Sequence, residues 1–150
     1  MSENQEQEIG FLIKHHYLND LSIENPLGTV AQEEAHALRL GMDGGVKVNP
    51  LAEANSFQVA ITLRLTAALG ERVVFLAELT YRVDVELHGI PEPVRPHVLC
   101  VEVPTAIFPV IQEILTRNGA YAGYPDLQVA PLDFREIFNR NESMKPAGVL

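Results

Sequence analysis

Between Ser56 and Leu87 the chain alternates apolar and polar residues over two long stretches, which Gly70-Glu71 separates. Such period-two alternation is typical of β-strands, because successive side chains of a strand point to opposite faces of the sheet. The apolar residues of each stretch share one parity: Phe57, Val59, Ile61, Leu63, Leu65, Ala67 and Leu69, then Val73, Phe75, Ala77, Leu79, Tyr81, Val83, Val85 and Leu87. The pattern predicts a long hairpin with one dry face, which another part of the chain must cover.

The opposite face of this hairpin is predicted to contact water. Its residues are mostly polar: Arg64, Thr66, Glu78, Thr80, Arg82, Asp84 and Glu86. Val74 and Leu76 interrupt this polar set, and Leu18 falls on the polar side of an earlier strand. Apolar residues in such positions favour a surface that binds other chains, although they equally fit an extension of the core or an oligomer contact.

The preceding residues predict two further strands. Residues 9–23 alternate until Asn25-Pro26 and Gly28 end the strand, and residues 29–36 form a polar crossover. Residues 37–42 alternate again, and we expect Asp43-Gly44-Gly45 to break this strand and to start a loop that continues to Asn55.

Helices are predicted only in the last third of the chain. Three prolines between residues 89 and 96 predict an irregular loop, and an apolar stripe at spacings of three and four predicts a helix over residues 104–118 that Gly119 ends. After a loop over 119–131, Asp133 is expected to cap a short helix over residues 133–141. The fold class is therefore α+β, a four-stranded antiparallel sheet with the C-terminal helices packed on one face.

Composition limits the classes of function. The 150 residues carry a net charge of −9, which repels nucleic-acid backbones and favours basic partners. No apolar run predicts a membrane span, and the acidic start of the chain does not fit a secretory signal, so a cytoplasmic location is expected. One domain is predicted over residues 9–142, with a disordered N-terminus over 1–8 and a flexible tail over 143–150.

Candidate chemical groups are few. Cys100 lies among apolar residues, which favours a packing thiol over a nucleophile. His15 and His16 are neighbours in a strand and must point to opposite faces, so they cannot chelate one metal ion. Asp84, Glu86 and His88 share one face and are the only support for a hydrolytic or small-ligand-binding domain. A solvated strand face explains this row better, and neither an enzyme nor a cofactor is expected.

Four segments of the chain resemble motifs of the SecB family of bacterial export chaperones. They occur in the family's order: YLNDLSIENP at 17–26, TAALGE with FLAE between 66 and 78, IFP at 107–109 with Glu113, and YPDLQVAPLDFREIF at 124–138. The resemblance implies a homotetramer, a dimer of dimers with its helices between two outer sheets. It further implies an ATP-independent holdase that binds unfolded precursor proteins in apolar grooves and delivers them to SecA, whose zinc-binding tail docks on the sheet.

The resemblance also implies site residues. The positions that correspond to the family's SecA contacts are Asp20, Glu24, Leu76 and Glu78. Those that correspond to its client groove are Leu38, Leu40, Met42, Phe108, Tyr124 and Phe138. A routine solvated face is the alternative for the first set, and a buried core is the alternative for the second.

Several positions depart from the family pattern. The crossover has no tryptophan, Arg82-Val-Asp-Val85 replaces a Gly-Gly-Ile-Phe motif, and the acidic glycine-rich tail is largely absent. These departures leave open a divergent SecB-like chaperone of a toxin-antitoxin system. A purely structural oligomer without clients is a third interpretation.

Overall fold

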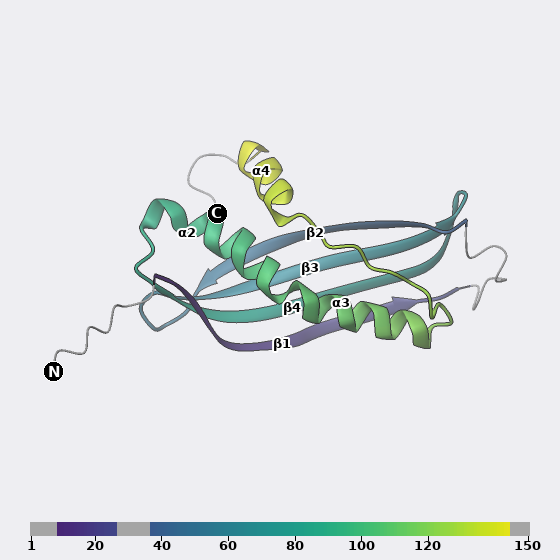
Figure 1. Cartoon of the computed structure of the whole chain (residues 1–150), viewed down its shortest axis with the longest axis horizontal. Helices are drawn as coiled ribbons and strands as arrows, with labels where there is room; N and C mark the ends of the chain where they lie inside the picture. Colours follow the sequence, from purple (N-terminus) through teal and green to yellow (C-terminus); the bar gives the residue numbers. More distant parts are fainter. Residues whose placement is uncertain (1–8, 27–36, 145–150) are drawn as a thin grey trace.

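The computed structural model describes residues 9–26 and 37–144, with side chains as far as residue 140. Its four strands form one antiparallel sheet in the order β1-β4-β3-β2 (Figure 1). Their bounds are β1 Gly10–Glu24, β2 Arg39–Pro50, β3 Ser56–Leu69 and β4 Arg72–His88. The predicted hairpin is thus the centre of the sheet, and the predicted fold class is confirmed.

The hairpin buries the apolar face that its alternation predicts. Ile61, Leu63 and Leu79 are almost completely buried, whereas their sequence neighbours Thr62, Arg64 and Glu78 are exposed. Gly70 has a φ of 60°, a left-handed conformation that suits glycine at the first central position of a two-residue turn.

One bulge changes the predicted faces at the start of β4. The register shifts between Ala67 and Ala68 of β3, so that Phe75 pairs with Ala67 but Val73 pairs with Ala68. Val74 is completely buried and Val73 is 48% exposed. The prediction that Val73 lies on the dry face and Val74 on the polar face is therefore wrong, because a bulge reverses the alternation that follows it.

Two bulges within β1 also move residues to the face opposite the predicted one. The register with β4 shifts between Ile13 and His15 and again between Leu18 and Asp20. Leu18 pairs with buried Tyr81 on the helix-covered face, which corrects its predicted place on the polar side. His16 lies on this covered face too, where its Nδ1 is 2.6 Å from the Tyr81 hydroxyl oxygen, and His15 points to the opposite face as predicted.

β2 extends beyond its predicted end. Asp43-Gly44-Gly45 does not break the strand, because every residue from Arg39 to Pro50 pairs in unbroken register with β3. A Cβ at Gly44 would overlap the Leu63 side chain and come within 2.6 Å of the Thr62 carbonyl oxygen. Glycine here allows a close approach to β3, so it maintains the strand that it was expected to end.

The helical region starts earlier than predicted. It consists of η1 Glu92–Val94, α2 Arg95–His97, the π-helical η2 Val98–Glu102 and α3 Val103–Tyr121. Pro93 and Pro96 occupy first-turn positions, where a missing N–H costs little. The wide η2 turn precedes Pro104, whose ring would clash with a regular helical turn. The predictions of an irregular loop up to residue 96 and of a helix start at Pro104 are therefore wrong.

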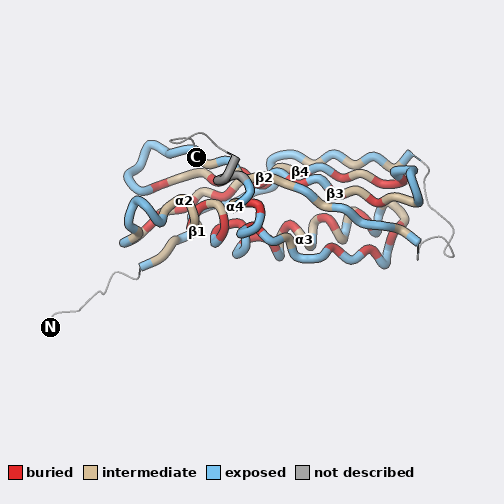
Figure 2. Tube along the Cα trace, turned by 90° about the horizontal axis from the view of Figure 1, so that it is seen from above, coloured by how far each residue is buried: buried red, intermediate tan, exposed pale blue. Residues whose placement is uncertain are grey.

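The helices cover one face of the sheet. α3 crosses the sheet diagonally, and the chain then returns along it to α4 Phe134–Met144 (Figure 1). Seen from above, sheet and helices form two layers, both of which contain buried residues (Figure 2). Gly119 lies inside α3 and does not end it, since a Cβ there would come 2.5 Å from Leu127 Cδ2 of the returning segment.

The continuous helical stretch Glu92–Tyr121 is long and apolar enough to span a membrane by length and composition alone. However, 56% of its most apolar window is buried within the described part of the molecule. Ile107, Ile111 and Leu115 lie on this buried side. A core helix requires the same composition, and packing on the sheet accounts for the apolar residues here.

Candidate docking surface and client groove

The four residues that correspond to SecA contacts meet on the exposed face of the sheet. Glu24 of β1 pairs directly with Leu76 of β4. Asp20 of β1 pairs with Thr80, which lies two positions after Glu78 on the same face of β4. Ser22 pairs with Glu78 between these two rows. Adjacent strands lie about 4.8 Å apart, so residues more than 50 positions apart in the sequence form one continuous surface. We call Asp20, Glu24, Leu76 and Glu78 the docking surface.

The docking surface combines negative charge with a partly accessible apolar centre. Asp20, Glu24 and Glu78 are exposed, and Leu76 between them is half-buried. The Arg64 guanidinium of β3 lies 3.4 Å from the Glu78 carboxylate, with both side chains about half exposed. This arrangement suits a basic segment that also carries an apolar side chain.

Part of the predicted client groove lies along the β2 edge of the covered face. Leu40 pairs with Ala67 and Met42 pairs with Leu65, both of which are buried beneath the helices. Leu40 is nevertheless 41% exposed, and Leu38 and Met42 are half-buried. β2 is an edge strand, so its inward side chains remain accessible at the rim of the sheet.

Two other predicted groove residues are part of the core in the single chain. The Phe108 ring packs edge-on against Phe134 at a centroid distance of 5.8 Å, and Tyr124 packs similarly against Phe75 at 5.6 Å. Phe108 and Tyr124 are only 4% and 5% exposed. Burial also raises the pKa of the Tyr124 phenol. In the single chain these two rings therefore offer a client almost no accessible surface.

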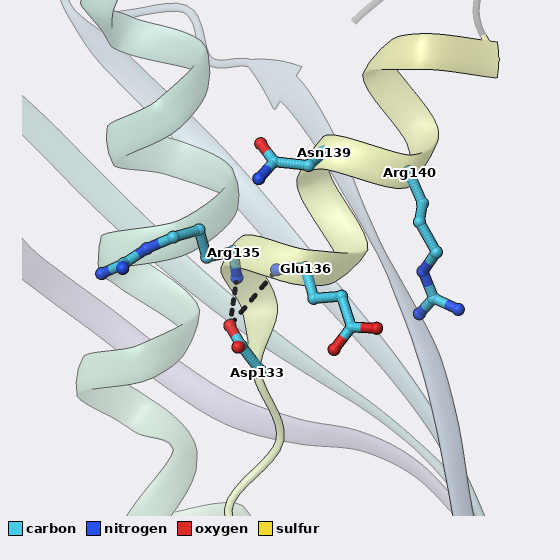
Figure 3. Close-up of a pocket in the computed structure, with 5 residues that line it drawn as sticks. All are labelled: Asp133, Arg135, Glu136, Asn139 and Arg140. Atoms are coloured by element: carbon cyan, nitrogen blue, oxygen red, sulfur yellow. Dashed lines mark hydrogen bonds between the residues drawn. The ribbon is translucent and has the colours of Figure 1, made fainter.

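Phe138 lies on α4, the last described helix. It is half-buried and packs edge-on against His97 at a centroid distance of 5.9 Å. Asp133 caps α4 as predicted, because its Oδ1 accepts hydrogen bonds from the backbone N–H groups of Arg135 and Glu136 (Figure 3). The open hollow of about 400 Å³ beside this cap is lined by polar side chains, so it does not belong to an apolar groove.

Asp84, Glu86 and His88, the residues that would support a hydrolytic domain, contact neighbouring side chains on the surface of the sheet. The Gln58 side-chain amide donates a hydrogen bond of 2.9 Å to Asp84, and Glu86 lies 3.5 Å from the Lys14 ammonium. His88 Nε2 is 3.6 Å from Glu86. Among the described residues, no group of three or more His, Cys, Asp or Glu side chains could hold a metal ion. These contacts fit a solvated strand face.

One contact that the sequence did not predict links the residue after β1 to the segment that follows α3. The Asn25 side chain donates a hydrogen bond of 2.6 Å to the Ala122 carbonyl oxygen, and the Tyr124 hydroxyl lies 3.5 Å from the Asn25 Oδ1. The end of β1, beside the docking surface, is thereby fixed to the segment that follows α3. In the sequence, Asn25-Pro26 indicates only the end of a strand, because Ala122, the hydrogen-bond partner of Asn25, lies 97 positions away.

The chain matches a family model described as "Preprotein translocase subunit SecB" over residues 4–145. The chain belongs to the SecB family. It is 32% identical over 135 residues to the protein-export protein SecB of Parvibaculum lavamentivorans, covering 87% of this chain and 77% of the relative. The SecB of Sinorhizobium fredii is 35% identical over 126 residues, covering 81% and 74%.

A solved structure confirms the SecB-like fold. A SecB-like chaperone of Mycobacterium tuberculosis, solved in complex with an antitoxin peptide, matches with a TM-score of 0.69 and 16% sequence identity. The match covers 82% of this chain and 91% of the other. Family membership and fold together support a chaperone role, and proteins of the SecB family are soluble bacterial chaperones rather than enzymes.

Proposed function

We propose that this chain is an ATP-independent holdase that binds unfolded precursor proteins in the bacterial cytoplasm and delivers them to SecA. The observation that carries this proposal is the separation of two surfaces on opposite faces of one sheet. The acidic docking surface lies on the open face, and the apolar residues Leu38, Leu40 and Met42 lie at the rim of the covered face. A carrier needs both surfaces accessible simultaneously, so that a loaded chaperone can still dock.

The rim of β2 suits weak and reversible holding. Burying one large apolar side chain gains roughly 1.5–3 kcal/mol at best, and ordering the client removes part of this gain. A single segment is therefore held loosely. Several grooves on one assembly raise the overall affinity through effective concentration, while each segment still exchanges rapidly. Folded proteins expose few apolar segments, which explains a preference for unfolded clients.

We expect a homotetramer, arranged as a dimer of dimers. Both outer strands of the described sheet have an unpaired edge, and β1 carries Leu12, Tyr17 and Leu18 with exposed fractions of 36–50%. Long unpaired edges with apolar residues favour association with another copy. Light scattering at micromolar concentration should give about four times the chain mass of 16.6 kDa. A monomer under these conditions would contradict the proposed architecture.

The test of the proposed function is suppression of aggregation. A chemically unfolded precursor is diluted into buffer with the chaperone, and light scattering is followed with and without the zinc-loaded tail peptide of SecA. We expect about one tetramer per precursor to suppress aggregation and the peptide to bind without releasing the precursor. Unchanged aggregation at a tenfold excess of chaperone would refute the holdase function.

The alternative is a divergent SecB-like chaperone that holds an antitoxin. The M. tuberculosis structure contains such a peptide, and this chain shares its fold. The same aggregation assay decides between the two, because an antitoxin chaperone would protect one cognate antitoxin and leave export precursors to aggregate. The SecA tail peptide would then fail to bind.

A further inference from the structure

Glycines create a shallow hollow on the open face of the sheet, next to the docking surface. Gly41 and Gly45 of β2 pair with Thr66 and Thr62 of β3, whose side chains point to the open face. The hollow has a volume of about 430 Å³ and lies over β2 and β3, with Glu78 of β4 at its margin. A second hollow of about 420 Å³ adjoins it at Gly41, and Asp43 and Arg64 line both.

The packing of the chain does not account for Gly45. A Cβ built at this position meets no atom within 4 Å, and its φ lies outside the range that requires glycine. At Gly44, in contrast, a Cβ would overlap the Leu63 side chain. Glycine weakens a strand, so an open strand position usually carries a larger residue. Glycine in a strand often indicates that another backbone or a ligand approaches closely.

The charged side chains beside the hollow indicate which kind of group approaches Gly45. Asp43 and Glu78 are exposed carboxylates on either side of Arg64, which pairs with Glu78 at 3.4 Å. Because both members of this pair are about half exposed, it contributes little to stability. A cation from another molecule can therefore replace Arg64 between the two carboxylates at little cost.

We propose that the docking surface continues across β3 into the glycine hollow of β2, and that a basic, extended segment of the SecA tail crosses the strands here. The segment would cross β2 over Gly45 and place a Lys or Arg side chain between Asp43 and Glu78. Three strand spacings of about 4.8 Å separate β1 from β2, a distance that about four to five extended residues span. This inference rests on the proposed function and extends its docking site by two strands, β3 and β2.

The test uses Gly45→Leu, which fills the hollow without a predicted clash. We expect its affinity for the zinc-loaded SecA tail peptide, measured by fluorescence anisotropy, to fall at least tenfold. Its Tm should stay equal to or exceed that of the unmodified protein, since leucine is a better strand residue than glycine. The matched control is Asn49→Leu, an exposed position on the same strand and face but outside the hollow, and its affinity should change less than twofold.

A second variant covers the case in which Gly45→Leu does not fold. Asp43→Asn removes one carboxylate without changing side-chain size, and it should weaken peptide binding at least threefold. Full peptide affinity in both variants, together with a loss in Glu78→Lys, would overturn the inference and leave the proposed function intact.

If the unmodified protein does not bind the tail peptide, the proposed SecA delivery fails. The hollow is then tested with a tetralysine peptide, by following the backbone amide signals of Gly41, Gly44 and Gly45 by NMR. Shifts confined to these amides would support a basic segment in the hollow. Unchanged signals at millimolar peptide would overturn the inference as well.

Discussion

Replacing Glu78 with lysine should lower the affinity for the SecA tail peptide at least tenfold while leaving the holding of precursors unchanged. Glu78 is half exposed and lies 3.4 Å from the Arg64 guanidinium. The substitution changes the local charge by two and places two cations side by side on the docking surface. A tenfold loss corresponds to about 1.4 kcal/mol, which is within the range of a single reversed contact between charged surfaces.

Calorimetric titration of the peptide measures this effect, and the aggregation assay measures holding in the same preparation. Glu53→Lys is the matched control, because it changes the net charge equally at an exposed loop position away from the docking surface. The difference between the two variants should shrink at high salt, since screening weakens exposed charge interactions. Equal loss of docking and holding would indicate a folding defect, and equal loss in both variants would indicate an effect of net charge alone.

The alternation of apolar residues predicted the sheet because β3 and β4 pair over their whole length with a single bulge. Their covered faces follow from period two, and the fold class follows from the need to bury that face. Errors began where a bulge shifts the register, as at Val74 and at Leu18. A bulge depends on how two strands pair, so the sequence of one strand does not reveal it.

Glycine and proline were the other source of error. Asp43-Gly44-Gly45 and Gly119 predict a strand end and a helix end, but Gly44 and Gly119 instead allow a close approach by Leu63 and Leu127 from other segments. Pro93, Pro96 and Pro104 each occupy one of the first two positions of η1, α2 and α3. Local preferences cannot distinguish a break from a close approach, because the approaching side chain is distant in sequence.

The candidate sites were predictable to different degrees. The four docking residues lie together because β1 and β4 pair without a bulge from Asp20 to Glu24, where parity determines the exposed positions. Parity alone could not separate groove from core, since both occupy the covered face. Leu40 remains accessible only because β2 is an edge strand, whereas Phe108 is buried beneath α4. Accessibility therefore depends on the strand order, which the sequence pattern does not contain.

Replacing Leu40 with arginine should weaken the holding of an unfolded precursor about tenfold. Leu40 is 41% exposed at the rim of the covered face, beside half-buried Leu38 and Met42. A client side chain that packs on this rim loses an apolar partner and meets a charge that must keep its water. The loss of roughly 1.4 kcal/mol is slightly less than full burial of one leucine gains.

The dissociation constant of a labelled, permanently unfolded precursor measures this loss, and the Tm shows whether the fold is intact. Leu40→Glu separates apolar contact from charge, because both variants should weaken holding if contact decides and only one should if charge decides. Val73→Arg is the matched control, since Val73 is 48% exposed at the hairpin end, outside the predicted groove. Unchanged holding in Leu40→Arg would remove the β2 rim from the client groove. Because Leu40 lies on the face opposite the docking surface, SecA tail binding should stay within twofold in both Leu40 variants.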